Sequence, residues 1–145
     1  MAVTSGHRAW MLVAVAVGGA IGTMARYELA LAEPVGNGRF PWATFGANVT
    51  GSLVLGIAVV VWADQRAASG VARAFVAVGI CGGLTTFSTW MVESVLLTRD
   101  GDAGLAVVYL VVSLVVGFAA VASGVAGARR VLHRPAFAFD PKQDD

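Results

Sequence analysis

Charged residues are scarce in this sequence: Lys, Arg, Asp and Glu make up 13% of its 145 residues, and the net charge is +1. An ordinary soluble domain contains about 25% charged residues, and the mean hydropathy of +0.75 is too high for one. A soluble enzyme is excluded because so few charged residues cannot supply the polar surface that keeps a globular protein in solution. A disordered chain is excluded because its apolar content would be much lower. The near-neutral balance leaves no basic surface for nucleic acid. The composition therefore predicts a small integral membrane protein.

Cysteine and histidine are also rare. Cys81 is the single cysteine of the sequence, which excludes a disulfide within the chain and a zinc site built on cysteines. His7 and His133 lie near opposite ends of the chain, outside its apolar runs. We therefore expect both histidines at the membrane surface rather than on a metal.

Long apolar runs are abundant instead. Four of them are about long enough to cross ~30 Å of hydrocarbon as helices, and none alternates as the strands of a barrel do. We predict an all-α membrane protein with four transmembrane helices over residues of about 10–26, 42–62, 74–97 and 105–128. The first run, preceded by Arg8, resembles a signal peptide, but it ends at Arg26 and Tyr27 without a convincing cleavage signal. We therefore expect a mature helix there.

The four spans form one domain over residues 1–132, followed by a polar C-terminal tail over residues 133–145. An even number of spans places both termini on one side of the membrane. That side carries seven Lys and Arg residues and the other side three, which favours cytoplasmic termini, while insertion in both orientations stays open. The seven are Arg8, Arg66, Arg73, Arg129, Arg130, Arg134 and Lys142, and the three are Arg26, Arg39 and Arg99.

Small and polar residues mark particular faces of the spans. Gly18 and Gly22 form a GxxxG face on the first span, which permits close helix contact. Because such a face needs something to pack against, we expect an oligomer. The second span carries a polar stripe at i, i+4 and i+8, and the fourth carries one at i and i+4. These stripes consist of Thr44, Asn48 and Ser52, and of Tyr109 and Ser113.

Polar groups are costly in lipid, so both stripes should face protein or a permeating solute. The hydroxyl groups of Ser and Thr can donate a hydrogen bond to the i−4 backbone carbonyl of their own helix. The amide of Asn48 cannot do so as easily, and it is therefore the better indication of a site. Hydrogen bonding between helices remains the alternative for Asn48.

The third span contains the segment GICGGLTTFSTW over residues 79–90. Gly82 and Gly83, followed by Thr85 and Thr86, are poor helix formers. We predict a break in the helix here, which frees backbone carbonyls that need partners away from water. In transporters such breaks gather carbonyls around a cation. A simple glycine kink is the alternative.

Aromatic rings and neutral donors follow the expected break. Phe87 and Trp90, at i and i+3, present two rings beside Thr86 and Ser88. Ring edges are weakly positive, and neutral donors replace part of an anion's water without trapping the ion. We expect charged residues only at the ends of the spans, which disfavours a carrier built on an intramembrane carboxylate. These residues indicate a passive path for a small anion and do not identify the ion.

Two charged residues lie at the ends of spans. Arg26 could add a positive field to a vestibule, with interfacial snorkelling as the alternative. Glu93 lies one turn beyond Thr89 at the expected rim of the third span. It could pair with Arg26, line a vestibule or be a solvated interfacial carboxylate, and we leave it out of the site.

The sequence resembles the Fluc/CrcB family of fluoride channels in three segments. They are GGAIGTMARY over residues 18–27, GANVTGSLVLG over residues 46–56, and GGLTTFSTW over residues 82–90. Tyr109 and Ser113 fit the same pattern, so the resemblance extends over all four spans.

This resemblance implies a fluoride-selective passive channel in the cell membrane that exports fluoride from the cytoplasm. It implies a dual-topology antiparallel homodimer with two fluoride pathways and a structural sodium ion at its centre. Backbone carbonyls at positions corresponding to Gly82 and Thr85 would hold the sodium. The fluoride pathway would correspond to Asn48, Phe87, Trp90, Thr86, Ser88, Tyr109, Ser113 and Arg26.

The sequence departs from the family pattern at two positions. Trp90 replaces the second phenylalanine of the family's pair, and Gly117 lies where a further hydroxyl would extend the polar track. Some family members work as oppositely oriented pairs of homologues, so a paired homologue is an alternative to the homodimer.

Two other functions remain as alternatives. A small multidrug-type exporter also has four helices, but it should carry a glutamate within its first span, and the run from Trp10 to Ala25 has none. A non-transporting membrane scaffold subunit needs small-residue faces, but it does not need the segment GGLTTFSTW.

Overall fold

The computed structural model describes residues 5–33, 38–64 and 70–132. Four helices in these ranges are long and apolar enough to cross a membrane: Gly6–Ala32, Trp42–Ala63, Gly70–Arg99 and Ala103–Leu132. The prediction of four spanning helices is confirmed, and each helix extends beyond or to the limits expected from hydropathy. The polar tail over residues 133–145, together with Arg66, His133, Arg134 and Lys142, lies outside the described residues.

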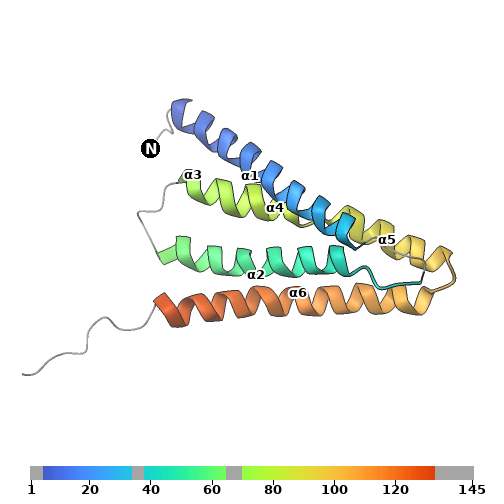
Figure 1. The fold of residues 1–145 in the computed structure, drawn as a ribbon. Coiled ribbons are helices and arrows are strands. Elements are labelled where there is room, and N and C mark those ends of the chain that lie inside the picture. Colours follow the sequence, from blue (N-terminus) through green and yellow to red (C-terminus); the bar gives the residue numbers. More distant parts are fainter. Residues whose placement is uncertain (1–4, 34–37, 65–69, 133–145) are drawn as a thin grey trace, which may run out of the picture.

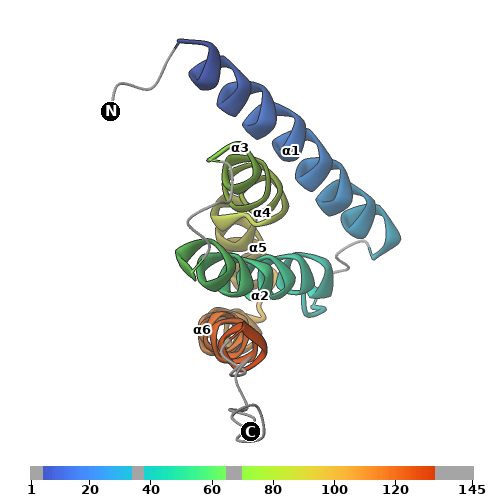
Figure 2. The ribbon, with the colours of Figure 1, turned by 90° about the vertical axis from the view of Figure 1, so that its left-hand side faces the viewer.

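The elements follow in the order α1 (Ser5–Ala32), α2 (Trp42–Asp64), α3 (Gly70–Arg73), a π-helix η1 (Ala74–Ile80), α4 (Cys81–Leu84), α5 (Phe87–Arg99) and α6 (Ala103–Leu132). Helix α2 packs along α6, and α1 lies against η1 and α4 (Figure 1). Seen from one end, α1, the segment α3 to α5, α2 and α6 follow one another across the molecule (Figure 2). The start of α1 and the end of α6 lie at the same end of the bundle.

Glycines allow α1 to approach the third span closely. A Cβ added at Gly18 would collide with the carbonyl oxygen of Phe75, and one at Gly22 with that of Ile80. The GxxxG face that we expected to require a second chain therefore packs within this chain, and it is no argument for an oligomer. The glycines that bring α2 and α6 equally close are Gly56 and Gly124.

Two extended residues interrupt the third span. Helix α4 ends at Leu84, Thr85 has φ −81° and ψ 152°, Thr86 has φ −149° and ψ 129°, and α5 begins at Phe87. The oxygen Oγ1 of Thr86 caps α5 by accepting a hydrogen bond of 3.2 Å from the amide of Thr89. The paired glycines themselves remain helical, so the extended backbone is carried by the two threonines that follow them.

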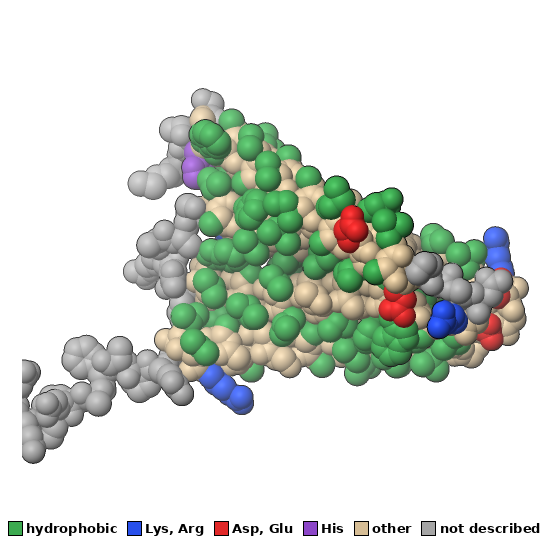
Figure 3. All heavy atoms as spheres, in the orientation of Figure 1, with side chains coloured by type: hydrophobic (Ala, Val, Ile, Leu, Met, Phe, Trp, Pro, Cys, Tyr) green, Lys and Arg blue, Asp and Glu red, His purple; other side chains and the backbone are tan. Residues whose placement is uncertain are grey.

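The outer surface of the bundle is largely apolar. Hydrophobic side chains are spread over its length, whereas the basic side chains in view lie toward its two ends and the acidic ones lie between its middle and the end opposite the N-terminus (Figure 3). Large side chains such as Leu12 on α1 and Phe118 on α6 are 72% and 74% exposed. A surface of this kind is stable in lipid rather than in water, and the chain is a multi-pass membrane protein.

Candidate ion pathway

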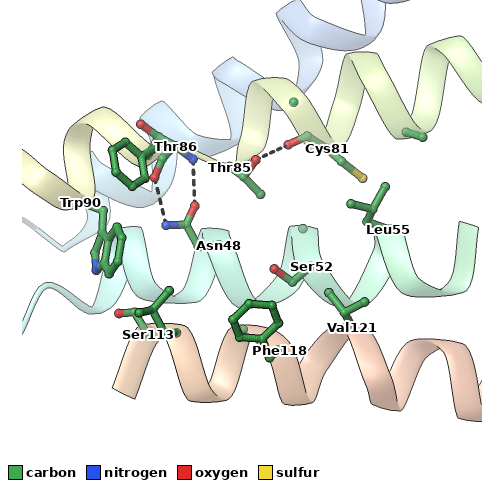
Figure 4. A pocket seen from close by; sticks show the side chains of 16 residues that line it. Asn48, Ser52, Leu55, Cys81, Thr85, Thr86, Trp90, Ser113, Phe118 and Val121 are labelled. Carbon is green, nitrogen blue, oxygen red and sulfur yellow. Dashed lines mark hydrogen bonds between the residues drawn. The ribbon is translucent and has the colours of Figure 1, made fainter. Parts of the chain in front are cut away.

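An open groove of about 450 Å³ lies between α2, α6 and the interrupted third span. Its lining combines aliphatic and aromatic side chains with a few neutral polar groups (Figure 4). Residues predicted from the sequence that line it are Asn48, Gly82, Thr85, Thr86, Phe87, Trp90 and Ser113, joined by Ser52 and Gly117. The groove thus brings together seven of the ten residues expected at the two ion sites.

Asn48 on α2 holds the extended backbone of the third span. Its oxygen Oδ1 accepts a hydrogen bond of 2.8 Å from the amide of Thr86, and its Nδ2 donates one of 3.1 Å to the carbonyl of the same residue (Figure 4). Buried backbone groups need partners where water is absent. One side chain therefore satisfies both backbone groups of a residue that has left the helix.

The carbonyls of Gly82 and Thr85 lose their ordinary helical donors. In a continuous α-helix the amide of Thr86 would donate to Gly82, but here it donates to Asn48. The amide of Thr89 would donate to Thr85, but here it donates to Oγ1 of Thr86. Two neutral carbonyl oxygens beside the groove suit a hard cation such as sodium. Two such oxygens alone are too few to surround a cation.

The two aromatic side chains differ in their surroundings. The rings of Phe87 and Trp90 meet nearly edge to face, with centroids 5.6 Å apart and an interplanar angle of 67°. Phe87 is 70% exposed, whereas Trp90 is only 9% exposed and packs with Leu97 and Tyr109. Phe87 therefore presents its ring freely beside the groove, and Trp90 is fixed by its packing.

Tyr109 lies behind the groove rather than on its lining. It is fully buried, and its hydroxyl donates a hydrogen bond of 2.7 Å to Oε2 of Glu93. The hydroxyl of Thr44 donates another of 2.7 Å to Oε1 of the same carboxyl group. The expected stripe of Tyr109 and Ser113 is thus divided, because Ser113 lines the groove and Tyr109 does not.

Glu93 corrects two expectations. One prediction from the sequence is that Glu93 is a solvated carboxylate at the membrane interface, and the other is that charged residues lie only at the ends of the spans. Glu93 is instead buried within α5, a full turn before its end, with both carboxyl oxygens hydrogen-bonded. The polar groups of α2 and α6 make this burial tolerable. The sequence around Glu93 carries no local signal for this burial, because the partners lie on two other helices.

A second cavity, of about 210 Å³, contains Arg26, Thr44, Thr89 and Glu93 in its lining. Arg26 does not reach the groove, but its Nε donates a hydrogen bond of 3.1 Å to the carbonyl of Gly83 in α4. Arg26 thereby connects α1 to the segment just before the extended residues. Ser88 is exposed, lies outside the groove lining, and has its hydroxyl 3.3 Å from that of Thr86.

Comparison with known proteins identifies the family of this chain. The model of the family described as "CrcB-like protein, Camphor Resistance (CrcB)" matches residues 13–125. The fluoride-specific ion channel FluC of Chlorobium luteolum is 41% identical over 115 residues, covering 79% of this chain and 89% of its own length. The fluoride-specific ion channel FluC 1 of Streptomyces coelicolor is 40% identical over 122 residues, covering 84% and 79%. FluC 1 of Mycobacterium bovis is 39% identical over 120 residues, covering 83% and 91%. The family model matches well over half of the chain and reaches into all four spans, so the chain belongs to the CrcB-like family.

Proposed function

We propose that this chain is a passive, fluoride-selective ion channel. The observation that carries the proposal is the groove in which Asn48 braces the extended backbone of Thr86 beside exposed Phe87. Relatives of about 40% identity are named fluoride-specific ion channels. Both facts favour conduction of a small anion over catalysis.

The groove offers an anion neutral partners rather than a fixed positive charge. Amide, hydroxyl and ring-edge donors can substitute for part of the hydration of fluoride. Arg26, the cationic side chain predicted for the path, lines the second cavity rather than the groove. An anion held by neutral groups leaves more readily than one paired with a buried cation, as conduction requires.

The working unit is proposed to be an antiparallel homodimer. The groove is open along one side of the chain, and exposed apolar side chains such as Leu114 and Phe118 belong to its lining. A second copy related by a two-fold axis would close it and place two sets of carbonyls from Gly82 and Thr85 face to face. A sodium ion between them would hold the interface together, since carbonyl oxygens are suitable ligands for a hard cation.

Export of fluoride is the proposed physiological direction. Fluoride enters acidified cells as neutral HF and ionises inside, so its anion accumulates in the cytoplasm. A passive channel in the cell membrane lets that anion leave down its electrochemical gradient and thereby protects the cell. No coupling ion is needed for this direction.

Ion efflux from liposomes tests the proposed function. Purified chain is reconstituted with internal fluoride and chloride, and release is read with electrodes selective for each anion while a potassium ionophore balances charge. We expect rapid fluoride release, no chloride release and no need for a proton gradient. Release that requires a proton gradient would indicate an exporter. No release from a folded dimer would favour a scaffold subunit, and no release from a monomer would indicate a missing homologous partner.

A further inference from the structure

Two hydrogen-bond donors in the groove lining have no partner among the residues that the structure describes. Nε1 of Trp90 on α5 and Oγ of Ser113 on α6 are both shielded from solvent and make no hydrogen bond within the described part of the chain. Both residues line the groove, and Figure 4 shows their polar atoms toward the same end of it. Buried polar atoms usually have a hydrogen-bond partner, so two unpaired donors toward the same end of the groove need an explanation.

The geometry of helix α6 does not prevent the hydroxyl of Ser113 from making a hydrogen bond. A serine in a helix can donate to the carbonyl four residues before it, and Ser94 does so, with a hydrogen bond of 2.8 Å to the carbonyl of Trp90. Thr98 makes the same kind of bond, of 2.9 Å, to Ser94. Ser113 has the same option on Tyr109 and makes no such bond. Its hydroxyl is therefore free to serve another acceptor.

Trp90 is held so that its N–H cannot easily turn away. The indole belongs to one buried cluster with Leu97, Ala106 and Tyr109, and its ring meets that of Phe87. An indole N–H is a donor only, so a ligand at this position must accept a hydrogen bond. The hydroxyl of Ser113 can also donate. Two neutral donors that lie toward the same end of the groove without a bonded acceptor fit a small anion.

We propose that the indole N–H of Trp90 and the hydroxyl of Ser113 together form an anion subsite in the groove. This inference rests on the proposed function in taking the anion to be fluoride, the strongest hydrogen-bond acceptor among the halides. Direct hydrogen bonding from an indole replaces the ring-edge contact that a phenylalanine would offer at this position. Both donors are shielded from solvent, so an ion must give up water where it meets them.

Indole NMR signals test the subsite without any flux measurement. The sequence has four tryptophans, and the signal of Trp90 is identified by its loss in Trp90→Phe. We expect added sodium fluoride to shift the Trp90 indole proton downfield and saturably. Sodium gluconate at equal concentration controls for ionic strength and should leave it in place. The signal of exposed Trp10, identified by Trp10→Phe, should not follow fluoride.

Two matched serine variants then test the pairing. Ser113→Ala removes one donor and should raise the fluoride concentration at the midpoint of the Trp90 shift by about tenfold or more, the usual effect of losing a hydrogen bond to a charged group. Ser94→Ala removes a hydroxyl that is already satisfied on its own helix, so it should leave the midpoint unchanged. The wild-type titration stands by itself if a variant does not fold.

The outcomes separate the subsite from the channel. A Trp90 signal that ignores fluoride, in a chain whose liposomes release fluoride, would overturn the subsite and leave the channel proposal intact. A shift unaffected by Ser113→Ala, or matched by gluconate, would also overturn it. A saturable shift that depends on Ser113, in a chain whose liposomes release no fluoride, would support the subsite and contradict the channel.

Discussion

At the scale of single residues, Asn48 carries two hydrogen bonds that a continuous helix would make with its own backbone. Asn48→Asp keeps an acceptor for the amide of Thr86 but replaces the donor to its carbonyl with a second oxygen. We expect it to lower the free energy of unfolding by about 1–3 kcal/mol, the cost of one buried unsatisfied carbonyl, and to abolish fluoride efflux. Thermal unfolding in detergent and liposome flux measure the two effects.

The matched control for this change lies on the same helix. Thr50 is exposed on α2 and lies outside the groove lining, so Thr50→Ala should alter neither stability nor flux. An Asn48→Asp variant with wild-type stability would contradict the bracing role assigned to Asn48.

Glu93 gives the second prediction at this scale. Tyr109→Phe removes the hydroxyl that donates to Oε2 of Glu93, and we expect a loss of stability of about 1–3 kcal/mol. In combination with Glu93→Gln the two effects should not add, with a coupling of about 0.5–3 kcal/mol in thermal unfolding. Tyr27→Phe, at a tyrosine that is 57% exposed, is the control. Simple additivity would mean that the contact contributes nothing to stability.

The sequence alone predicts part of this groove, because some of its residues stand out from the apolar sequence around them. Asn48, Thr86, Phe87, Trp90 and Ser113 could be found because an amide, an aromatic pair or a hydroxyl stands out in an apolar helix, and the groove does bring them together. Glu93 was misplaced because a charge normally marks the end of a span. Its burial depends on hydroxyls from two other helices, and such tertiary contacts leave no local pattern.

At the scale of elements, the contact between α1 and α4 depends on glycine. A Cβ at Gly83 would collide with the carbonyl oxygen of Gly19, whereas a Cβ at Gly19 would meet no described residue within 4 Å. Gly83→Ala must push two backbones apart, and we expect it to lower the free energy of unfolding by about 1–3 kcal/mol. Gly19→Ala should be neutral or slightly stabilising, because alanine favours helix. Equal thermal unfolding midpoints for the two variants would contradict this close packing.

The positions of the spanning helices are predictable from the sequence, but their exact ends and the π-helical segment are not. Apolar runs located all four spans, since lipid demands uninterrupted apolar helices. Helix α1 nevertheless extends from Ser5 to Ala32, because a helix continues into the interface after its hydrophobicity ends. The π-helix over Ala74–Ile80 has no signature in its apolar sequence, and it lies where the glycines of α1 press against it.

At the scale of the whole molecule, the groove is open along one side, and the described part of the chain provides no cover for it. Apolar lipid-facing surface is ordinary in a membrane protein, and it gives no measure of how many chains assemble. The groove differs because its lining also holds carbonyls without their helical donors and neutral polar side chains. Polar groups of this kind are not stable against lipid tails, which favours a second chain as the cover.

Filling the groove should therefore separate the chains. Gly117 on α6 belongs to the groove lining, so Gly117→Trp places a large ring where a partner would pack. We expect the wild-type chain to migrate as a dimer in detergent and the variant to shift toward monomer, as read by light scattering with size exclusion. Gly127→Trp is the control, because Gly127 lies on the same helix, outside the groove lining, with no described residue within 4 Å of an added Cβ. A dimeric, conducting Gly117→Trp chain would mean that the groove faces lipid, and the proposed antiparallel interface would have to lie on another face of the bundle.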